Sequence, residues 1–563
     1  IHGETGFELS PGNALELAAF SLSGRDFGLF GDIRADGLQS GITISGALDA
    51  AYEDASHLST LAGRPLSGQV SAALAGHYTV LSRGFDAELT VNGLDVTVDQ
   101  EQLDRLLAGE ATITASARRD ETGIELRELS VDAQRLVAQA QGTISSAATD
   151  LRASLRLASL TDADPAMAGS LTAEAAVTGA PGARRVTLTG EAADLVLGIA
   201  ELDRALQGRT DLDLAAQERE GGFVVERFRL GNPQLTAEGQ GSFGTELDAA
   251  LTLDIPSLTA LRPEFSGALH ATARATGQAG ERRIEVTGSG EDLRLGQQDL
   301  DGALTGTTDF RLAALQKGDV ITIDELRLTN AQMAANVAGV WGENVADLAG
   351  HAEIRSLAAF GRGWRGALEL DGSLRDDGTG QRLFQLDGTG QDLSLGQDAV
   401  DGALAGETRL SVRGSQRGEV ITIERAVLDN ASASADVAGS IGNGQTNISG
   451  KLDLRDLSAF GMGWRGSFAA TGSFADDGTG VRRLVVDGLG RDLSLGQAQA
   501  DAALAGETRL TLRGSERAGV LTLEQAVLDN PRLHATAQGT LGGGGTDVTA
   551  DLRADSLAFL GNG

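Results

Sequence analysis

The sequence predicts an all-β protein with an elongated repeat architecture, in which one continuous antiparallel sheet curls into an open hydrophobic trough. Three observations lead to this fold class. The 563 residues include 77 Gly but only 8 Pro, a balance typical of many tight turns between hydrogen-bonded strands. Apolar and polar residues alternate with a period of two, as in a strand that has one buried and one solvent-exposed face. Finally, whole phrases recur about every 100 residues.

The repeat is measured from the glycine that ends the phrase D-x-x-L-x-G. It recurs at intervals of 99, 98, 100 and 100 residues, as Gly109, Gly208, Gly306, Gly406 and Gly506. Longer phrases recur at the same interval, such as "AAFGRGWRG" and "SAFGMGWRG". We therefore expect a divergent unit, four full units and an incomplete unit in a section of a longer protein, at 1–84, 85–187, 188–287, 288–387, 388–487 and 488–563.

Within a repeat the strands are read from alternation. In "TRLSVRG" Leu410 and Val412 alternate with polar residues. The segments "SASADVAG" and "DVTADLRA" show the same alternation. Short Gly-, Asp- and Asn-rich segments separate the strands and indicate hairpins. About eight strands per repeat are expected. The segment 201–207 has helical spacing, but its Gly- and Ala-rich later copies predict a strand or bent connection.

A continuous trough is favoured over a string of separate sandwiches. No Pro-rich linker separates the repeats, aromatic residues are only 4% of the chain, and the inward positions hold many small residues that would leave a closed sandwich thinly filled. Something other than the protein's own side chains can then fill the trough. The inward positions expected to line it are Leu410, Val412, Ala433, Ala435, Val437, Leu452, Leu454, Leu510, Leu512, Val548, Ala550 and Leu552.

Composition also narrows the function. The absence of cysteine excludes disulfides, thiolate metal sites and a Cys nucleophile. A formal charge of −33 disfavours nucleic-acid binding. The six His are scattered, "DDGTG" is interpreted as a hairpin turn in preference to a calcium loop, and the recurring acids Asp301, Asp401 and Asp501 are interpreted as backbone caps. We therefore expect no enzyme activity, no catalytic residue, no metal and no cofactor.

The repeated phrases "DLSLG…DGALAGETRL…ITIERAVLDN" resemble the periplasmic body of the TamB family, within the AsmA-like group of bridge-like lipid transfer proteins, over residues 85–563. The resemblance implies a β-taco fold in the periplasm of a Gram-negative bacterium. It also implies an inner-membrane anchor and contact with a TamA-like outer-membrane barrel of the Omp85 type, both through regions outside this chain.

The function implied by the resemblance is a conduit that carries phospholipid between the inner and outer membranes. An apolar trough independently suits this task, because acyl chains exposed to water cost about 0.8 kcal/mol per CH₂. Two alternatives stay open: an assembly factor for outer-membrane β-barrel proteins or secreted autotransporters, and an extracellular adhesin built of β-sandwich repeats.

Overall fold

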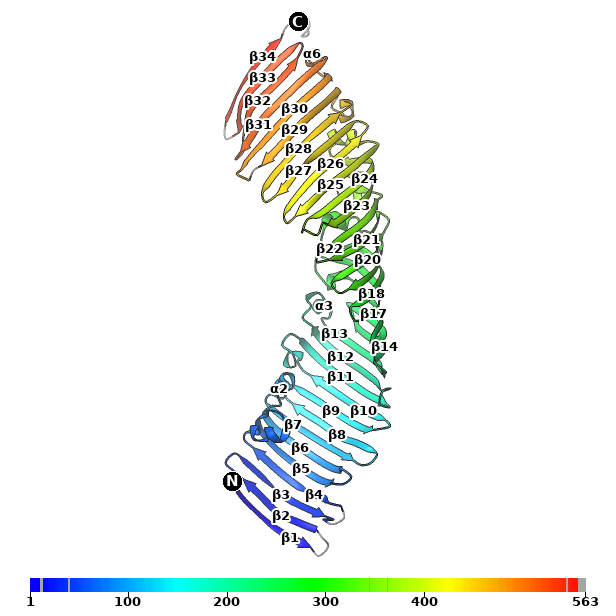
Figure 1. Ribbon diagram of the computed structural model, residues 1–563, viewed down its shortest axis with the longest axis vertical. Coiled ribbons are helices and arrows are strands. Elements are labelled where there is room, and N and C mark those ends of the chain that lie inside the picture. Colours follow the sequence, from blue (N-terminus) through cyan, green and yellow to red (C-terminus); the bar gives the residue numbers. More distant parts are fainter. Residues whose placement is uncertain are drawn as a thin grey trace. The chain divides into compact units, whose positions relative to one another are not determined.

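The computed structural model describes residues 1–10, 14–38, 41–343, 345–361, 363–476, 478–542 and 545–554. The 34 strands in these residues belong to one antiparallel sheet, which confirms the predicted fold class (Figure 1). The chain divides into two compact units, Ile1–Ala279 (unit 1) and Gly280–Gly563 (unit 2). This division does not test the repeat boundaries expected from the sequence, which stay a prediction.

Unit 1 is a meander in which each strand pairs with the next along the chain. Its elements are β1 (His2–Ser10), β2 (Ala14–Ser23), β3 (Phe27–Asp36), β4 (Thr43–Tyr52), η1 (Ala55–Leu58), α1 (Ser59–Ala62), β5 (Ser67–Thr79), β6 (Gly84–Thr97), α2 (Glu101–Leu106), β7 (Glu110–Arg119), β8 (Gly123–Ala133), β9 (Leu136–Ser145), β10 (Thr149–Leu157), η2 (Leu160–Asp162), β11 (Ala168–Gly179), β12 (Arg185–Val196), α3 (Ala200–Ala205), β13 (Arg209–Arg219), β14 (Gly222–Asn232), β15 (Leu235–Gly244), β16 (Glu246–Ile255), η3 (Leu258–Ala260) and β17 (Ser266–Gln278).

Unit 2 repeats the same meander. Its elements are β18 (Glu281–Arg294), α4 (Gln298–Asp301), β19 (Thr307–Lys317), β20 (Val320–Thr329), β21 (Met333–Gly342), β22 (Val345–Ile354), η4 (Leu357–Ala359), β23 (Trp364–Asp376), β24 (Arg382–Leu395), α5 (Asp398–Asp401), η5 (Gly402–Leu404), β25 (Glu407–Arg417), β26 (Val420–Asn430), β27 (Ala433–Gly442), β28 (Gln445–Leu454), η6 (Leu457–Phe460), β29 (Arg465–Asp476), β30 (Val481–Ser494), α6 (Ala498–Ala503), β31 (Glu507–Arg517), β32 (Val520–Asn530), β33 (Leu533–Gly542) and β34 (Gly545–Ala554).

Each 100-residue period contains six strands, so the expectation of about eight was wrong. The short α-helices α2 to α6 follow every sixth strand, after β6, β12, β18, β24 and β30. The strands are 9 to 14 residues long, whereas the average strand has about five or six residues. Because the hairpin turns are short, nearly all of each period is left for long strands.

The segment that follows these strands is helical in all five copies, including those for which the sequence predicted a strand or bent connection. The glycines of the later copies permit close packing: a Cβ at Gly302 or Gly402 would collide with the carbonyl oxygen of Ala359 or Ala459. Small residues therefore bring the helix onto the neighbouring 3-10 turn. They do not signal a strand in this context.

Recurring aspartates cap backbone N–H groups between each of these strands and the helix that follows it, as expected. The carboxylates of Asp301, Asp401 and Asp501 accept the backbone N–H of Leu295, Leu395 and Leu495 at 2.7, 2.7 and 2.6 Å. That backbone N–H is the main reason that the pKa values of Asp401 and Asp501 are lowered. The hydrogen bonds confirm that these acids act as backbone caps.

The buried core lies at the end of the strands where helices and 3-10 turns cover the sheet. In the repeat around β24, Leu357, Leu393 and Leu404 form a cluster, against which Ile354, Leu368, Val400 and Leu428 pack. Equivalent leucines are buried in other copies, such as Leu206 and Leu304. Tertiary packing is therefore concentrated along one edge of the sheet.

A buried polar pair stabilises the same edge. Asn430, 3% exposed, donates from Nδ2 to Thr408 Oγ1 at 2.9 Å and to the carbonyl oxygens of Ala405 and Glu407, and its Oδ1 accepts the N–H of Ser432. Asn232, Asn330 and Asn530 make the same contact with Thr210, Thr308 and Thr508.

We predict that Asn430→Leu lowers the free energy of unfolding of unit 2 by about 2 kcal/mol, because the buried Thr408 hydroxyl and three backbone groups lose a hydrogen-bond partner. Urea denaturation followed by circular dichroism measures this loss. The control Asn447→Leu changes an exposed amide on β28 and should cost less than about 0.5 kcal/mol. Equal losses would contradict a special role of the buried pair.

Candidate functional site

Unit 2 carries three unbroken apolar rows on one face of its sheet. Residues directly opposite each other in antiparallel strands project to the same face, so the pairing register defines each row. We call the surface formed by these rows across β25 to β34 the apolar face. The first row is Leu410, Leu428, Ala435, Leu452, Ala470, Gly488, Leu510, Leu528, Ala535 and Leu552; the second is Val412, Ala426, Val437, Gly450, Gly472, Val486, Leu512, Ala526, Ala537 and Ala550; the third is Gly414, Ile423, Gly439, Ile448, Phe474, Leu484, Gly514, Leu523, Gly539 and Val548.

The structure places all twelve sequence-predicted lining residues on this face. Ten belong to the three rows, and the remaining two, Ala433 and Leu454, are opposite each other and two residues from Ala435 and Leu452. Several members are open to solvent: Leu452 is 40% exposed, Val548 40% and Leu552 70%. Most other row members are half-buried, and Gly414 is buried. The apolar face is thus partly open to solvent, while contact of these residues with lipid stays a prediction.

A β-bulge in each repeat keeps the rows continuous. Between β25 and β26 the register shifts after Arg413, and Ile423 and Ala426 then project to one face although two charged residues separate them. Corresponding shifts occur at β7–β8, β13–β14, β19–β20 and β31–β32. Strict alternation had not identified Ile423 and Ala426 as a pair; the doubled polar step "ER" in "ITIERAV" is the signal that a bulge leaves.

Glycines on the apolar face are covered by aromatic rings from the neighbouring strand. A Cβ at Gly414 would lie 2.6 Å from the ring of Phe384, its direct cross-strand partner. A Cβ at Gly488 would also collide with a ring, that of Phe468, whose direct cross-strand partner Gly490 lies two residues further along β30. The rings therefore fill the space that side chains at these glycines would take. The surface of the apolar face is even as a result. Sequence alternation missed Phe384 and Phe468.

The opposite face is polar. Arg425 and Asp436 form an ion pair of 2.9 Å between β26 and β27, and Arg455 and Asp429 form one of 2.7 Å. The guanidinium of Arg425 holds the pKa of Asp436 below its usual value. These groups are well exposed, so their main effect is to keep this face hydrated.

Unit 1 has the same two-faced construction. One row of directly opposed residues is apolar from β3 to β17: Leu29, Ala50, Ala72, Val91, Ile113, Val131, Ala138, Leu155, Ala173, Gly190, Leu212, Leu230, Ala237, Leu253 and Ala271. On the same face the sheet forms a cavity of about 190 Å³, lined mainly by apolar residues such as Ile33, Ile44, Leu48, Leu74 and Phe85. The apolar surface of unit 1 is therefore concave at this point.

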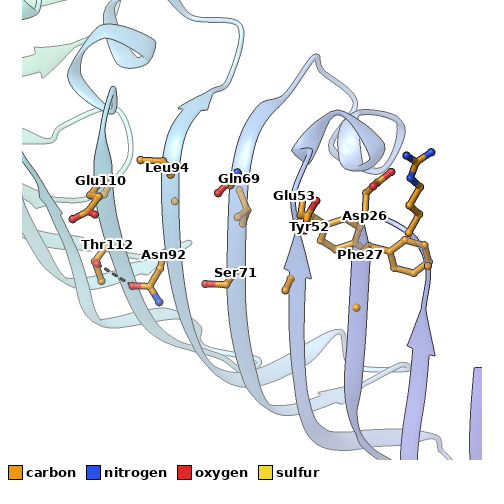
Figure 2. Close-up of a pocket in the computed structure, with 17 residues that line it drawn as sticks. Asp26, Phe27, Tyr52, Glu53, Gln69, Ser71, Asn92, Leu94, Glu110 and Thr112 are labelled. Atoms are coloured by element: carbon orange, nitrogen blue, oxygen red, sulfur yellow. Dashed lines mark hydrogen bonds between the residues drawn. The ribbon is translucent and has the colours of Figure 1, made fainter.

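A larger hollow of about 660 Å³ in unit 1 is lined by polar side chains (Figure 2). Ser71, Asn92 and Thr112 lie opposite one another on β5, β6 and β7, and Thr112 Oγ1 donates to Asn92 Oδ1 at 3.0 Å. The stacked rings of Phe27 and Tyr52, with centroids 5.7 Å apart, lie at its side. The row of Ser71, Asn92 and Thr112 projects to the face opposite the apolar row.

Nothing in the described part of the chain groups three or more His, Asp or Glu in positions suited to a metal ion. Of the helices in the described residues, none combines the length and apolar character needed to cross a bilayer. Comparison with protein-family models finds no match, and comparison with curated proteins finds none either. The two faces of the sheet are therefore the features of the described residues that bear on function.

Proposed function

We propose that the apolar face binds the acyl chains of phospholipids and lets them move along the sheet from one repeat to the next. The observation that carries this proposal is the presence of three apolar rows, unbroken over ten strands and partly open to solvent. Exposed apolar surface of this extent typically marks a binding site. Together with the resemblance to TamB, it supports a conduit in the Gram-negative periplasm that carries phospholipid between the inner and outer membranes.

The energetics favour movement as well as binding. Each CH₂ that leaves water gains about 0.8 kcal/mol, so a face long enough for whole acyl chains offsets most of the cost of removing a lipid from a membrane. Successive repeats present similar aliphatic residues in register, so a chain that leaves one repeat meets the same surface on the next. A deep well at any single position is then avoided. The polar head group stays in water at the open side.

The interactions outside this chain form part of the same proposal. Following the TamB resemblance, regions beyond this sequence anchor the protein in the inner membrane and contact an Omp85-type barrel in the outer membrane. Within this chain the activity needs no catalytic residue and no cofactor, because the work is distributed over the rows of the apolar face.

The proposal predicts that charges on the apolar face remove lipid locally. In Val437→Asp/Leu452→Asp, a photo-crosslinker at Val412 should capture phospholipid about tenfold less than in the parent protein, because an unpaired carboxylate beneath an acyl chain costs well over 1.4 kcal/mol. Mass spectrometry of the crosslinked lipid measures the effect, and circular dichroism confirms the β-fold.

A matched control uses Ser440→Asp/Ser449→Asp. These residues lie on the same two strands, with the same diagonal offset, but on the polar face. Lipid capture at Val412 should be unchanged in this variant. Equal losses in both variants would refute the apolar face as the binding surface. A lipid-free parent protein that binds unfolded β-strand peptides would instead support the assembly-factor alternative.

A further inference from the structure

One arginine per repeat stands on the same face as the apolar rows, at the end of the strands. In unit 2 these are Arg282 on β18, Arg382 on β24 and Arg482 on β30, spaced six strands apart. Arg382 lies two residues before Phe384 and four before Leu386, and Arg482 has the same spacing from Leu484 and Val486. Even spacing along a strand puts each arginine on the same side of its strand as these apolar residues, and Phe384 lies directly opposite Gly414 of the apolar face. In unit 1, Arg184 stands two residues before Val186 in the same way.

The cross-strand partners of these arginines differ in charge. Arg282 and Arg382 lie directly opposite the neutral Gln316 and Gln416. Arg482 lies opposite Glu516 and makes ion pairs of 3.5 Å with Glu516 and 3.2 Å with Asp476. Arg184 pairs with Glu218 at 3.7 Å. On the strand that follows, two arginines thus lie opposite an amide and two opposite a carboxylate. On the strand that precedes, Arg382 and Arg482 lie opposite Asp376 and Asp476.

Arg382 is the clearest case. Its guanidinium lies over the ring of Trp341, 5.5 Å from the centroid, and within the described residues it forms no ion pair. Asp376, which lies opposite it on β23, accepts the N–H of Gly378 at 2.8 Å. A guanidinium that stacks on an aromatic ring keeps its N–H edge available for an anion. In a chain of net charge −33, a guanidinium without an ion-pair partner among the described residues, beside an apolar surface, is therefore a candidate group for binding an anion.

We infer that these arginines bind the phosphate of a phospholipid head group whose acyl chains lie on the apolar face, with one station in each repeat. This inference rests on the proposed function and names the head group that the site selects. Guanidinium binds phosphate through paired, charge-assisted hydrogen bonds. Neighbouring stations are six strands, or about 29 Å, apart. The Gln-paired stations bind more tightly than the Glu-paired ones, because Gln316 and Gln416 stand where Glu218 and Glu516 place a competing carboxylate.

The test measures binding of two fluorescent lipids with identical acyl chains, phosphatidylglycerol and diacylglycerol, to the full chain. We expect the parent protein to prefer phosphatidylglycerol about tenfold, and Arg282→Gln/Arg382→Gln to remove most of that preference while diacylglycerol affinity stays constant. The control Arg413→Gln removes a charge from the polar face of β25 and should change neither affinity. Glu516→Gln, which copies the arrangement at Gln416, should raise phosphatidylglycerol affinity about threefold.

The outcomes separate this inference from the proposed function. If both lipids bind equally well to the parent and to the arginine variant, the head-group stations are refuted and the apolar face stands. If neither lipid binds, the proposed function itself fails. If inorganic phosphate displaces phosphatidylglycerol at equal concentration, the arginines form a site for free anions and the assignment to lipid is overturned.

Discussion

Replacement of Leu404 by alanine is expected to lower the free energy of unfolding of unit 2 by about 3 kcal/mol. Leu404 is 6% exposed and belongs to the cluster with Leu357 and Leu393, at the edge where the short helices cover the sheet. Removal of a buried isobutyl group loses its transfer free energy and leaves a cavity, since the covering turns are held by their own backbone hydrogen bonds. Urea denaturation followed by circular dichroism measures the change.

The matched control for this prediction is Leu452→Ala. Leu452 has the same side chain but is 40% exposed on the apolar face, so its truncation should cost less than about 1 kcal/mol. The pair of variants separates stability from function: Leu404→Ala should destabilise the fold, whereas Leu452→Ala should weaken lipid binding with little loss of stability. If both variants destabilised the protein equally, the apolar face would be a packed core and not a free surface.

Replacement of Gly466 by alanine is expected to cost about 3 kcal/mol or more of folding free energy. Gly466 sits at the register shift between β29 and β30 with φ of 96°, a region that L-residues rarely adopt. An added Cβ would also lie 2.5 Å from the carbonyl oxygen of Arg491. Backbone strain alone costs about 1–2 kcal/mol, and the collision adds to it.

Gly480→Ala isolates the two contributions. Gly480 has a similar φ of 82°, but nothing lies within 4 Å of its added Cβ. This control should therefore lose only about 1 kcal/mol. Hydrogen exchange of β29 and β30 measures the difference, and equal protection in the two variants would contradict the close approach of the strands at Gly466.

The "GWRG" phrase shows why particular residues recur from one repeat to the next. Its last glycine, Gly366 or Gly466, is the bulge residue, and the aspartate that follows on the partner strand, Asp392 or Asp492, adopts a φ near 50°. The carboxylate of Asp392 accepts the N–H of Gly406 at 2.9 Å, which lowers its pKa. These residues recur because every repeat forms the same β-bulge and the same turn at this position.

Local physics made much of this molecule predictable from its sequence. Alternation of apolar and polar residues follows directly from the geometry of a strand, so the all-β class and the membership of Leu410, Val437 and Val548 in one face could be derived without coordinates. The period of about 100 residues was equally visible. The number of strands was not, because strand length depends on how little chain the turns consume.

Which residues meet across strands depends on the folded chain and cannot be read from local patterns. The helical form of the segment around Gly402 depends on a backbone contact with Ala459, more than 50 residues away, and the filling of Gly414 depends on the ring of Phe384. The position of Arg382 beside Trp341, and opposite Gln416, follows from pairing register and bulges that no local pattern specifies. Sequence alternation determined what each face is made of, whereas long-range register determined where its charges stand.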